Sequence, residues 1–192
     1  SNTSCICFSN TQHLIYFIGS GVSPNKINKV LGVAKAYTTR VGEGPFPTEF
    51  KDEFQDFIRN KGKEFGATTG RPRRCGWFDS VMLKQAILLN GINELALTKM
   101  DVLDGLSEIK IAIAYKYKGK IFKEFPADYD VLCNCEPVYK TVKGWAEPLC
   151  KVKGFKQLPV NAKEYVKLLE DICGVKVTIL SVGSAREETF FL

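Results

Sequence analysis

The chain has 192 residues, of which 45% are apolar, 25% charged and 11% aromatic. This composition is typical of a globular protein and excludes a disordered, collagen-like or low-complexity chain. Lys and Arg number 27 and Asp and Glu 21, so the formal net charge is +6, which favours anionic partners such as phosphates. The basic residues are scattered rather than gathered into one tail, so no nucleic-acid-binding stripe is indicated.

The sequence carries no signal for a membrane span or a disulfide framework. Apolar runs such as residues 14–18 are far shorter than the roughly 20 residues that a bilayer crossing needs. The seven cysteines form an odd set without a CxxC pair, and the single histidine, His13, removes most zinc-site combinations. We therefore expect a soluble, cytoplasmic protein with reduced thiols. We interpret the pair Cys133 and Cys135 as incidental.

Three helices and a glycine-rich segment are predicted in the first half. Ser23 and Pro24 suit a helix start, and Ile27, Val30, Leu31 and Ala34 then keep the spacing of one helical face. Residues 38–47 are too rich in Gly and Pro for a helix or a central strand. Further helices are predicted over residues 51–61, before Gly62, and over residues 79–90, with Asp79 or Ser80 as cap and Gly91 as stop.

The second half is predicted to add strands. Residues 95–98 form a short apolar strand, and alternating residues 108–117 followed by 121–122 predict a hairpin through Lys118 and Gly119. A helix over residues 161–173 and a strand over 175–180 complete the pattern. Strands that alternate with helices predict an α/β fold with an antiparallel hairpin attached.

Two polar motifs follow predicted strands, where ligands bind in α/β folds. The Asp101 carboxylate can accept two hydrogen bonds from the N1–H and the exocyclic amine of guanine, and adenine has no matching donor pair. The Lys99 stem can lie along the base, and Gly183 lets backbone N–H groups approach a purine carbonyl. The sequence thus suggests a guanine pocket. Strand ends with solvated charges are the alternative.

A basic loop over residues 67–74 combines small hydroxyl residues with Arg71, Arg73 and Arg74. Because arginine binds carboxylates and phosphates through paired donors, this loop suits a dicarboxylate or a phosphorylated substrate. Three neighbouring guanidiniums repel one another unless an anion joins them. A solvated basic loop is the alternative. The segment over residues 39–45 is typical of a rigid turn against a ligand, whose identity local reasoning does not give.

Three segments resemble signature segments of the adenylosuccinate synthetase family. They are YTTRVGEGPFPTE (residues 37–49), EFGATTGRPRRCGW (residues 64–77) and LTKMDVLDGL (residues 97–106). The similarity extends from about residue 19 to the end and includes EPVY, the Gly144–Trp145 pair and SVG at residues 181–183. We therefore assign residues 19–192 to the carboxyl-terminal part of such a synthetase domain.

The resemblance implies a GTP-dependent ligase of AMP biosynthesis. Members use GTP to phosphorylate the 6-oxygen of IMP, and the amine of L-aspartate then displaces phosphate to give adenylosuccinate and GDP. It implies a large mixed-sheet domain flanked by helices, with the P-loop NTPase-like GTP-binding architecture of the family. It also implies Mg²⁺ as cofactor, a homodimer in the full-length enzyme, and no nucleic acid or membrane partner.

The resemblance also implies which residues bind the substrates. Arg71 would contact both IMP and the aspartate-binding loop, Val41 would offer a backbone contact to the IMP ribose, and Arg73 would also reach the GTP side. The aspartate and IMP set would be Val41, Ala67, Thr68, Thr69, Gly70, Arg71, Pro72 and Arg73. The GTP set would be Arg73, Lys99, Met100, Asp101, Ser181, Val182 and Gly183.

The chain departs from the family pattern in its first part. No GDEGKGK-like phosphate loop occurs, the catalytic Asp and His are missing, and His13 is not in the context of that histidine. We therefore expect no catalytic residue and no metal ligand here, and no turnover by these residues alone. Residues 1–18 are atypical, and residues 5–18 resemble inserted sequence. Pro72 replaces an Arg of many members.

Two other classes of function remain open on the sequence. A non-catalytic GTP-binding module would keep Asp101 but show no dependence on IMP or aspartate. A basic RNA-binding domain would bind oligonucleotides with a steep salt dependence and would ignore Asp101→Asn. We rank the RNA-binding domain last, because no aromatic platform occurs at RNA-recognition spacing.

Overall fold

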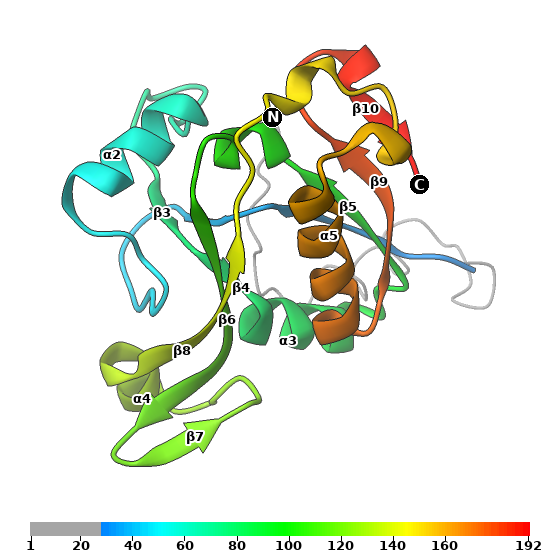
Figure 1. Ribbon diagram of the computed structural model, residues 1–192. Helices are drawn as coiled ribbons and strands as arrows, with labels where there is room; N and C mark the ends of the chain where they lie inside the picture. Colours follow the sequence, from blue (N-terminus) through cyan, green and yellow to red (C-terminus); the bar gives the residue numbers. More distant parts are fainter. Residues whose placement is uncertain (1–27) are drawn as a thin grey trace.

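The computed structural model describes residues 28–192, which contain three β-sheets with helices packed beside them (Figure 1). The first sheet has the order β1-β5-β9-β10, in which β1, β5 and β9 run parallel and β10 is antiparallel to β9. Its strands are β1 (Leu31–Lys35), β5 (Glu94–Thr98), β9 (Lys176–Ser181) and β10 (Thr189–Phe191). The central strand β5 is therefore paired on both sides by strands of its own direction.

The second sheet contains the hairpin, and its hairpin end projects from the body of the molecule together with α4 (Figure 1). Its strands are β4 (Phe78–Asp79), β6 (Glu108–Tyr117), β7 (Lys120–Phe122) and β8 (Glu136–Lys143). Strand β6 is parallel to β4 and antiparallel to β7 and β8. The two hairpin residues Lys118 and Gly119 both have positive φ, 46° and 78°, as a tight two-residue turn requires. A third sheet pairs β2 (Thr38–Arg40) with β3 (Arg74–Gly76).

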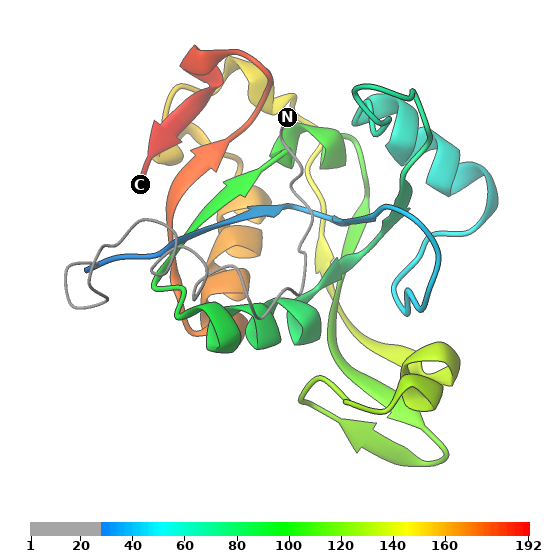
Figure 2. The same ribbon diagram turned by 180° about the vertical axis from the view of Figure 1, so that it is seen from behind.

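Helices pack beside these sheets. They are α2 (Asp52–Lys61), α3 (Ser80–Asn90), α4 (Tyr129–Asn134) and α5 (Val160–Cys173). Helix α5 covers one face of the first sheet, which Figure 2 shows from the opposite side. Its Tyr165 is fully buried, and the hydroxyl donates to the Ala36 carbonyl oxygen at 2.7 Å, which ties α5 to the end of β1. Among residues 28–192, no helix has the length and apolar character to cross a membrane.

Most of the predicted elements are confirmed, and the α/β class with an attached hairpin is confirmed. Asp79 is the N-cap of α3, because its Oδ1 accepts from the backbone N–H groups of Val81 and Met82, each at 3.1 Å. Gly91 and Gly174 end α3 and α5 in the left-handed conformation, with φ of 60° and 72°.

The helix predicted from Ser23 is wrong where the structure describes it; its first residues, 23–27, lie outside the described part. Residues 31–35 form β1, in which Gly32 and Ala34 face the core while Leu31 and Val33 are exposed. This alternation has a period of two, and parallel pairing with β5 sets it. The helical spacing in the sequence was incidental. The prediction also missed β2, β3, β4, β8, β10 and α4.

The backbone at Gly144 packs closely against the backbone at Leu106. A Cβ at this position would lie 1.8 Å from the Leu106 carbonyl oxygen, which is a backbone atom and cannot rotate away. We expect Gly144→Ala to lower the free energy of unfolding by about 3 kcal/mol, at the upper end for overpacking. Urea unfolding measures this, with Gly154→Ala as control because nothing lies within 4 Å of its added Cβ. Equal losses in both variants would contradict the close approach.

Asp79 makes stability depend on pH. Its second carboxylate oxygen accepts from the Tyr115 hydroxyl at 2.7 Å, and burial raises its pKa to about 6. Because the unfolded value is about 3.9, the folded state binds the proton more tightly, and this group lowers stability as pH rises from about 4 through 6. Asn keeps a cap acceptor without the titration. We therefore expect Asp79→Asn to gain stability relative to the wild type across this window, measured by urea unfolding between pH 4 and 7. A constant difference across these pH values would contradict the assignment.

Candidate functional site

The strand register brings the two segments predicted to hold guanine to one edge of the first sheet. Strands β5 and β9 are parallel neighbours, with Leu97 opposite Leu180. Residues 99–101 and 181–183 follow these positions directly, so both segments leave the sheet at its carboxyl edge. The tendency of ligands to bind beyond the carboxyl ends of parallel strands makes this edge a candidate site.

On the β5 side, Lys99 and Met100 have their side chains engaged. Lys99 adopts the left-handed conformation, with φ of 63°, and its Nζ donates to the Gly62 carbonyl oxygen at 2.7 Å. Met100 is fully buried in the core, so only its backbone can face a ligand.

Asp101 differs from its two neighbours. Its Oδ1 is buried and has no hydrogen-bond partner among the described residues. Burial raises the pKa of this carboxyl above its ordinary value, while its own backbone N–H and the charge of Lys99 oppose the shift. Because a buried acceptor without a donor is costly, Asp101 is suited to receive N–H donors from a ligand.

On the β9 side, a tight turn over residues 181–188 fixes the backbone. The Val182 N–H donates to the Glu188 carbonyl oxygen at 2.8 Å, and the Ala185 N–H donates to Glu188 Oε2 at 2.7 Å. Ser181 Oγ donates to the Gly183 carbonyl oxygen at 2.9 Å. A Cβ on Gly183 would lie 2.2 Å from Glu188 Oε2, so the Glu188 carboxylate packs closely against the Gly183 backbone. The Val182 side chain is buried and its N–H is engaged, so this residue shapes the turn.

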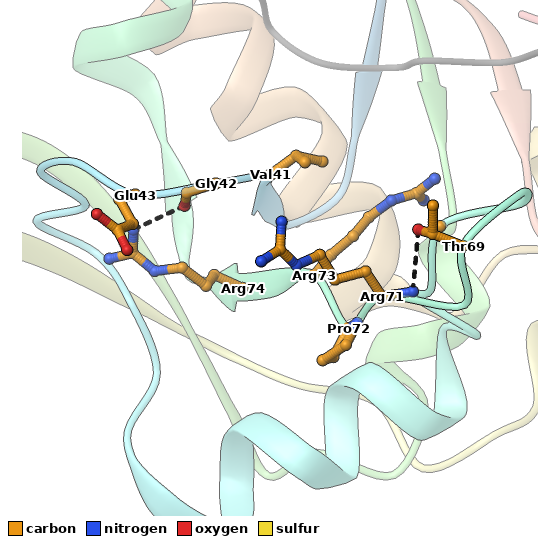
Figure 3. A pocket seen from close by; sticks show the side chains of 9 residues that line it. Val41, Gly42, Glu43, Thr69, Arg71, Pro72, Arg73 and Arg74 are labelled. Atoms are coloured by element: carbon orange, nitrogen blue, oxygen red, sulfur yellow. Dashed lines mark hydrogen bonds between the residues drawn. The ribbon is translucent and has the colours of Figure 1, made fainter.

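A separate cavity of about 600 Å³ lies between the turn that follows β2 and the basic loop (Figure 3). Its lining residues are Val41, Gly42, Glu43, Gly66, Thr69, Arg71, Pro72, Arg73 and Arg74. The loop folds back on itself, since the Gly66 N–H donates to the Arg71 carbonyl oxygen and the Gly70 N–H to that of Gly66, each at 2.8 Å. Of the predicted aspartate and IMP set, Ala67, Thr68 and Gly70 belong to the loop but not to the cavity lining.

The three arginines of the basic loop are not equivalent. Arg74 is paired with both carboxylate oxygens of Glu49, and its Nη1 also donates to the carbonyl oxygens of Gly42 and Gly44. It therefore stabilises the turn beside the cavity. Arg71 is exposed, with no side-chain partner among residues 28–192, so Arg71 and Arg73 remain to receive an anion.

A buried ionic cluster beneath the basic loop was not predicted from the sequence. Glu64 is fully buried, and its carboxylate accepts from Lys35 Nζ at 2.8 Å, the Tyr37 hydroxyl at 2.6 Å and Arg73 Nη1 at 2.9 Å. Burial alone would raise the pKa of Glu64, but these hydrogen bonds and the charge of Lys35 hold it below its ordinary value. Burial lowers the pKa of Lys35, against the pull of Glu64. Neighbouring arginines repel one another unless an anion lies between them. This requirement was the signal in the sequence that could have indicated a nearby carboxylate such as Glu64.

The described part of the chain contains no candidate Mg²⁺ site. Residues 28–192 contain no group of three or more His, Cys, Asp or Glu side chains placed to hold a metal ion. The described residues therefore do not fit the role of a Mg²⁺ site.

Comparison with known proteins gives the family. The family model described as adenylosuccinate synthetase matches residues 4–190. The adenylosuccinate synthetase of Caldanaerobacter subterraneus subsp. tengcongensis is 57% identical over 175 residues, and that of Carboxydothermus hydrogenoformans is 53% identical over 175. In both cases the match covers 91% of this chain and 41% of the relative.

A solved structure agrees with the sequence matches. The fully ligated adenylosuccinate synthetase from Plasmodium falciparum superposes with a TM-score of 0.87 and 38% identity, over 92% of this chain and 42% of that one. The chain thus spans about two fifths of the length of the proteins that it matches. Because the family model matches nearly all of its residues, the chain belongs to the adenylosuccinate synthetase family.

Proposed function

We propose that this chain is the carboxyl-terminal portion of an adenylosuccinate synthetase. The whole enzyme joins IMP and L-aspartate with the energy of GTP, giving adenylosuccinate, GDP and phosphate. In this proposal the chain supplies guanine recognition and the contacts to the aspartate carboxylates, and it works in the cytoplasm as part of a homodimeric enzyme. The Mg²⁺ ligands and the groups that transfer protons lie in the rest of the family's polypeptide.

The observation that carries the proposal is the Oδ1 of Asp101, which is buried and has no hydrogen-bond partner among residues 28–192. Guanine presents an N1–H and an exocyclic amine side by side, and a carboxylate can accept from both. Adenine would leave the carboxylate without these donors, which costs far more than a missing apolar contact. Lys99 and the turn over residues 181–183 follow β5 and β9 at the same edge of the sheet as Asp101, and the Lys99 stem and the turn would hold the base.

The cavity beside the basic loop is proposed to take aspartate. Arg71 and Arg73 supply two guanidiniums, and each can bind a carboxylate through paired donors. Thr69 and Gly70 lie in the same loop, with Ala67, Thr68 and Pro72, and would shape it around the ligand. Val41 is exposed at the opposite wall and would meet IMP through its backbone.

The proposal predicts selective binding of guanine nucleotides. After circular dichroism shows that the chain is folded, we expect calorimetry to detect GDP binding and ADP binding at least about tenfold weaker. Asp101→Asn should weaken GDP about 10- to 100-fold, because an amide offers one acceptor and a misplaced donor. Asp171→Asn, an exposed carboxylate on α5, is the control and should change nothing.

Two results would contradict the guanine assignment. Equal binding of GDP and ADP would indicate a general anion site. Binding of neither nucleotide would show that the chain alone does not hold guanine.

The proposal also predicts that the chain alone does not turn over. With GTP, IMP, L-aspartate and Mg²⁺ present, we expect no steady formation of adenylosuccinate, since the described residues include no metal site and no histidine. Absorbance of the product over time measures this. Sustained product formation that Asp101→Asn abolishes would overturn the assignment of the catalytic groups to another part of the polypeptide.

A further inference from the structure

The neck of the basic loop joins Glu64 to Arg73 through the main chain. The Arg73 N–H donates to the Glu64 carbonyl oxygen at 2.9 Å, and Phe65 and Pro72 form the next antiparallel bridge. Residues 64 and 73 therefore face each other where the loop closes. Any shift of Glu64 is transmitted directly to Arg73, one of the two arginines free to receive an anion in the cavity.

The side chains repeat this link. One oxygen of the Glu64 carboxylate accepts from Tyr37 and Lys35, and the other accepts from Lys35 and from Arg73 Nη1. The Glu64 side chain is only 1% exposed, so water does not compete for these bonds. Tyr37 and Lys35 come from β1 and the residues that follow it, which fixes the carboxylate to the first sheet. Glu64 therefore has one orientation.

Arg73 is held at one end and free at the other. Its carbonyl oxygen accepts from Arg59 Nε at 2.9 Å, and its Nη1 is bound by Glu64. Its Nε and Nη2 have no partner among residues 28–192, and its side chain is 22% exposed at the cavity wall. Because a guanidinium is planar and rigid, fixing one nitrogen restricts the direction of the others.

We infer that Glu64 is a positioning residue: it fixes the plane of the Arg73 guanidinium so that the remaining nitrogens receive a carboxylate in the cavity. This inference rests on the proposed function of the cavity. Lys35 has a defined part in it. A simple pair of Glu64 with Arg73 would cancel the charge that attracts an anion, but Lys35 shares the same carboxylate, so the three groups keep a net charge of +1.

A double-mutant cycle tests the positioning role. The probe is succinate, a dicarboxylate without an amine, titrated by calorimetry. Glu64→Asp keeps the negative charge but shortens the side chain, so its carboxylate no longer reaches Arg73. Arg73→Lys keeps the positive charge but replaces the planar guanidinium with a single ammonium group. We expect each variant to bind succinate about tenfold more weakly, and the double variant also about tenfold more weakly, because both changes remove one coupled interaction. Losses that multiply to about 100-fold would overturn the inference.

A control variant separates positioning from folding. Tyr37→Phe removes a hydrogen bond from the same carboxylate but leaves Lys35 bonded to both of its oxygens, so we expect succinate affinity to stay within about twofold while thermal stability falls. A tenfold loss in this variant would show that Glu64 acts only through the fold and would overturn the inference.

A second readout needs no ligand. With ¹⁵N-labelled arginine, the NMR signal of Arg73, identified by its loss in Arg73→Lys, should show restricted rotation of the guanidinium that Glu64→Asp releases. Free rotation in the wild type would overturn the positioning role. Restricted rotation without succinate binding would leave the positioning intact and would contradict the proposed function of the cavity.

Discussion

The parallel pairing of β5 with β1 on one side and β9 on the other determines where the chemistry lies. Lys35 pairs with Thr98 and Leu97 with Leu180, so the three strands end together. Two of these strands lead directly to a segment with a proposed ligand role, β5 to Asp101 and β9 to Gly183, and β1 leads through β2 to the turn with Val41. A slip of either pairing would separate these segments, because their placement depends on the common edge of one sheet.

Paired charges have two different roles around the basic loop. Glu49 pairs fully with Arg74 and makes that arginine part of the scaffold. Glu64 is shared between two cations, so the arginine that it holds keeps an attraction for anions. The Glu64 cluster is buried and would be costly to leave with one partner missing, which favours a single arrangement of the loop. The same physical interaction therefore fixes one arginine for structure and prepares another for a ligand.

Features whose cause lies in neighbouring residues could be predicted from the sequence, and features that depend on distant residues could not. Helix α3 was predicted to within a residue because its cap, Asp79, and its stop, Gly91, act on adjacent backbone. Strand β1 was predicted as a helix because its alternation becomes visible only once β5 pairs with it. The ligand-binding loops were found through motif resemblance, and their role stays a prediction.

The Glu64 cluster could not be read from spacing, since Lys35 is 29 residues and Tyr37 27 residues from Glu64 along the chain. Likewise, the unequal roles of Arg73 and Arg74 depend on carboxylates whose positions only the fold defines.

The hydrogen bond from Tyr165 to the Ala36 carbonyl spans 129 residues of sequence, and the bond from Thr98 to Ala34 spans 64. Such long-range pairing makes folding slow, because a large loop must close before its contacts stabilise anything. During synthesis at about 5–20 residues per second, β1 would leave the ribosome on the order of ten seconds before α5. For that interval the exposed strand has no helix to cover it, so the nascent chain depends on chaperones or on its own solubility to avoid aggregation.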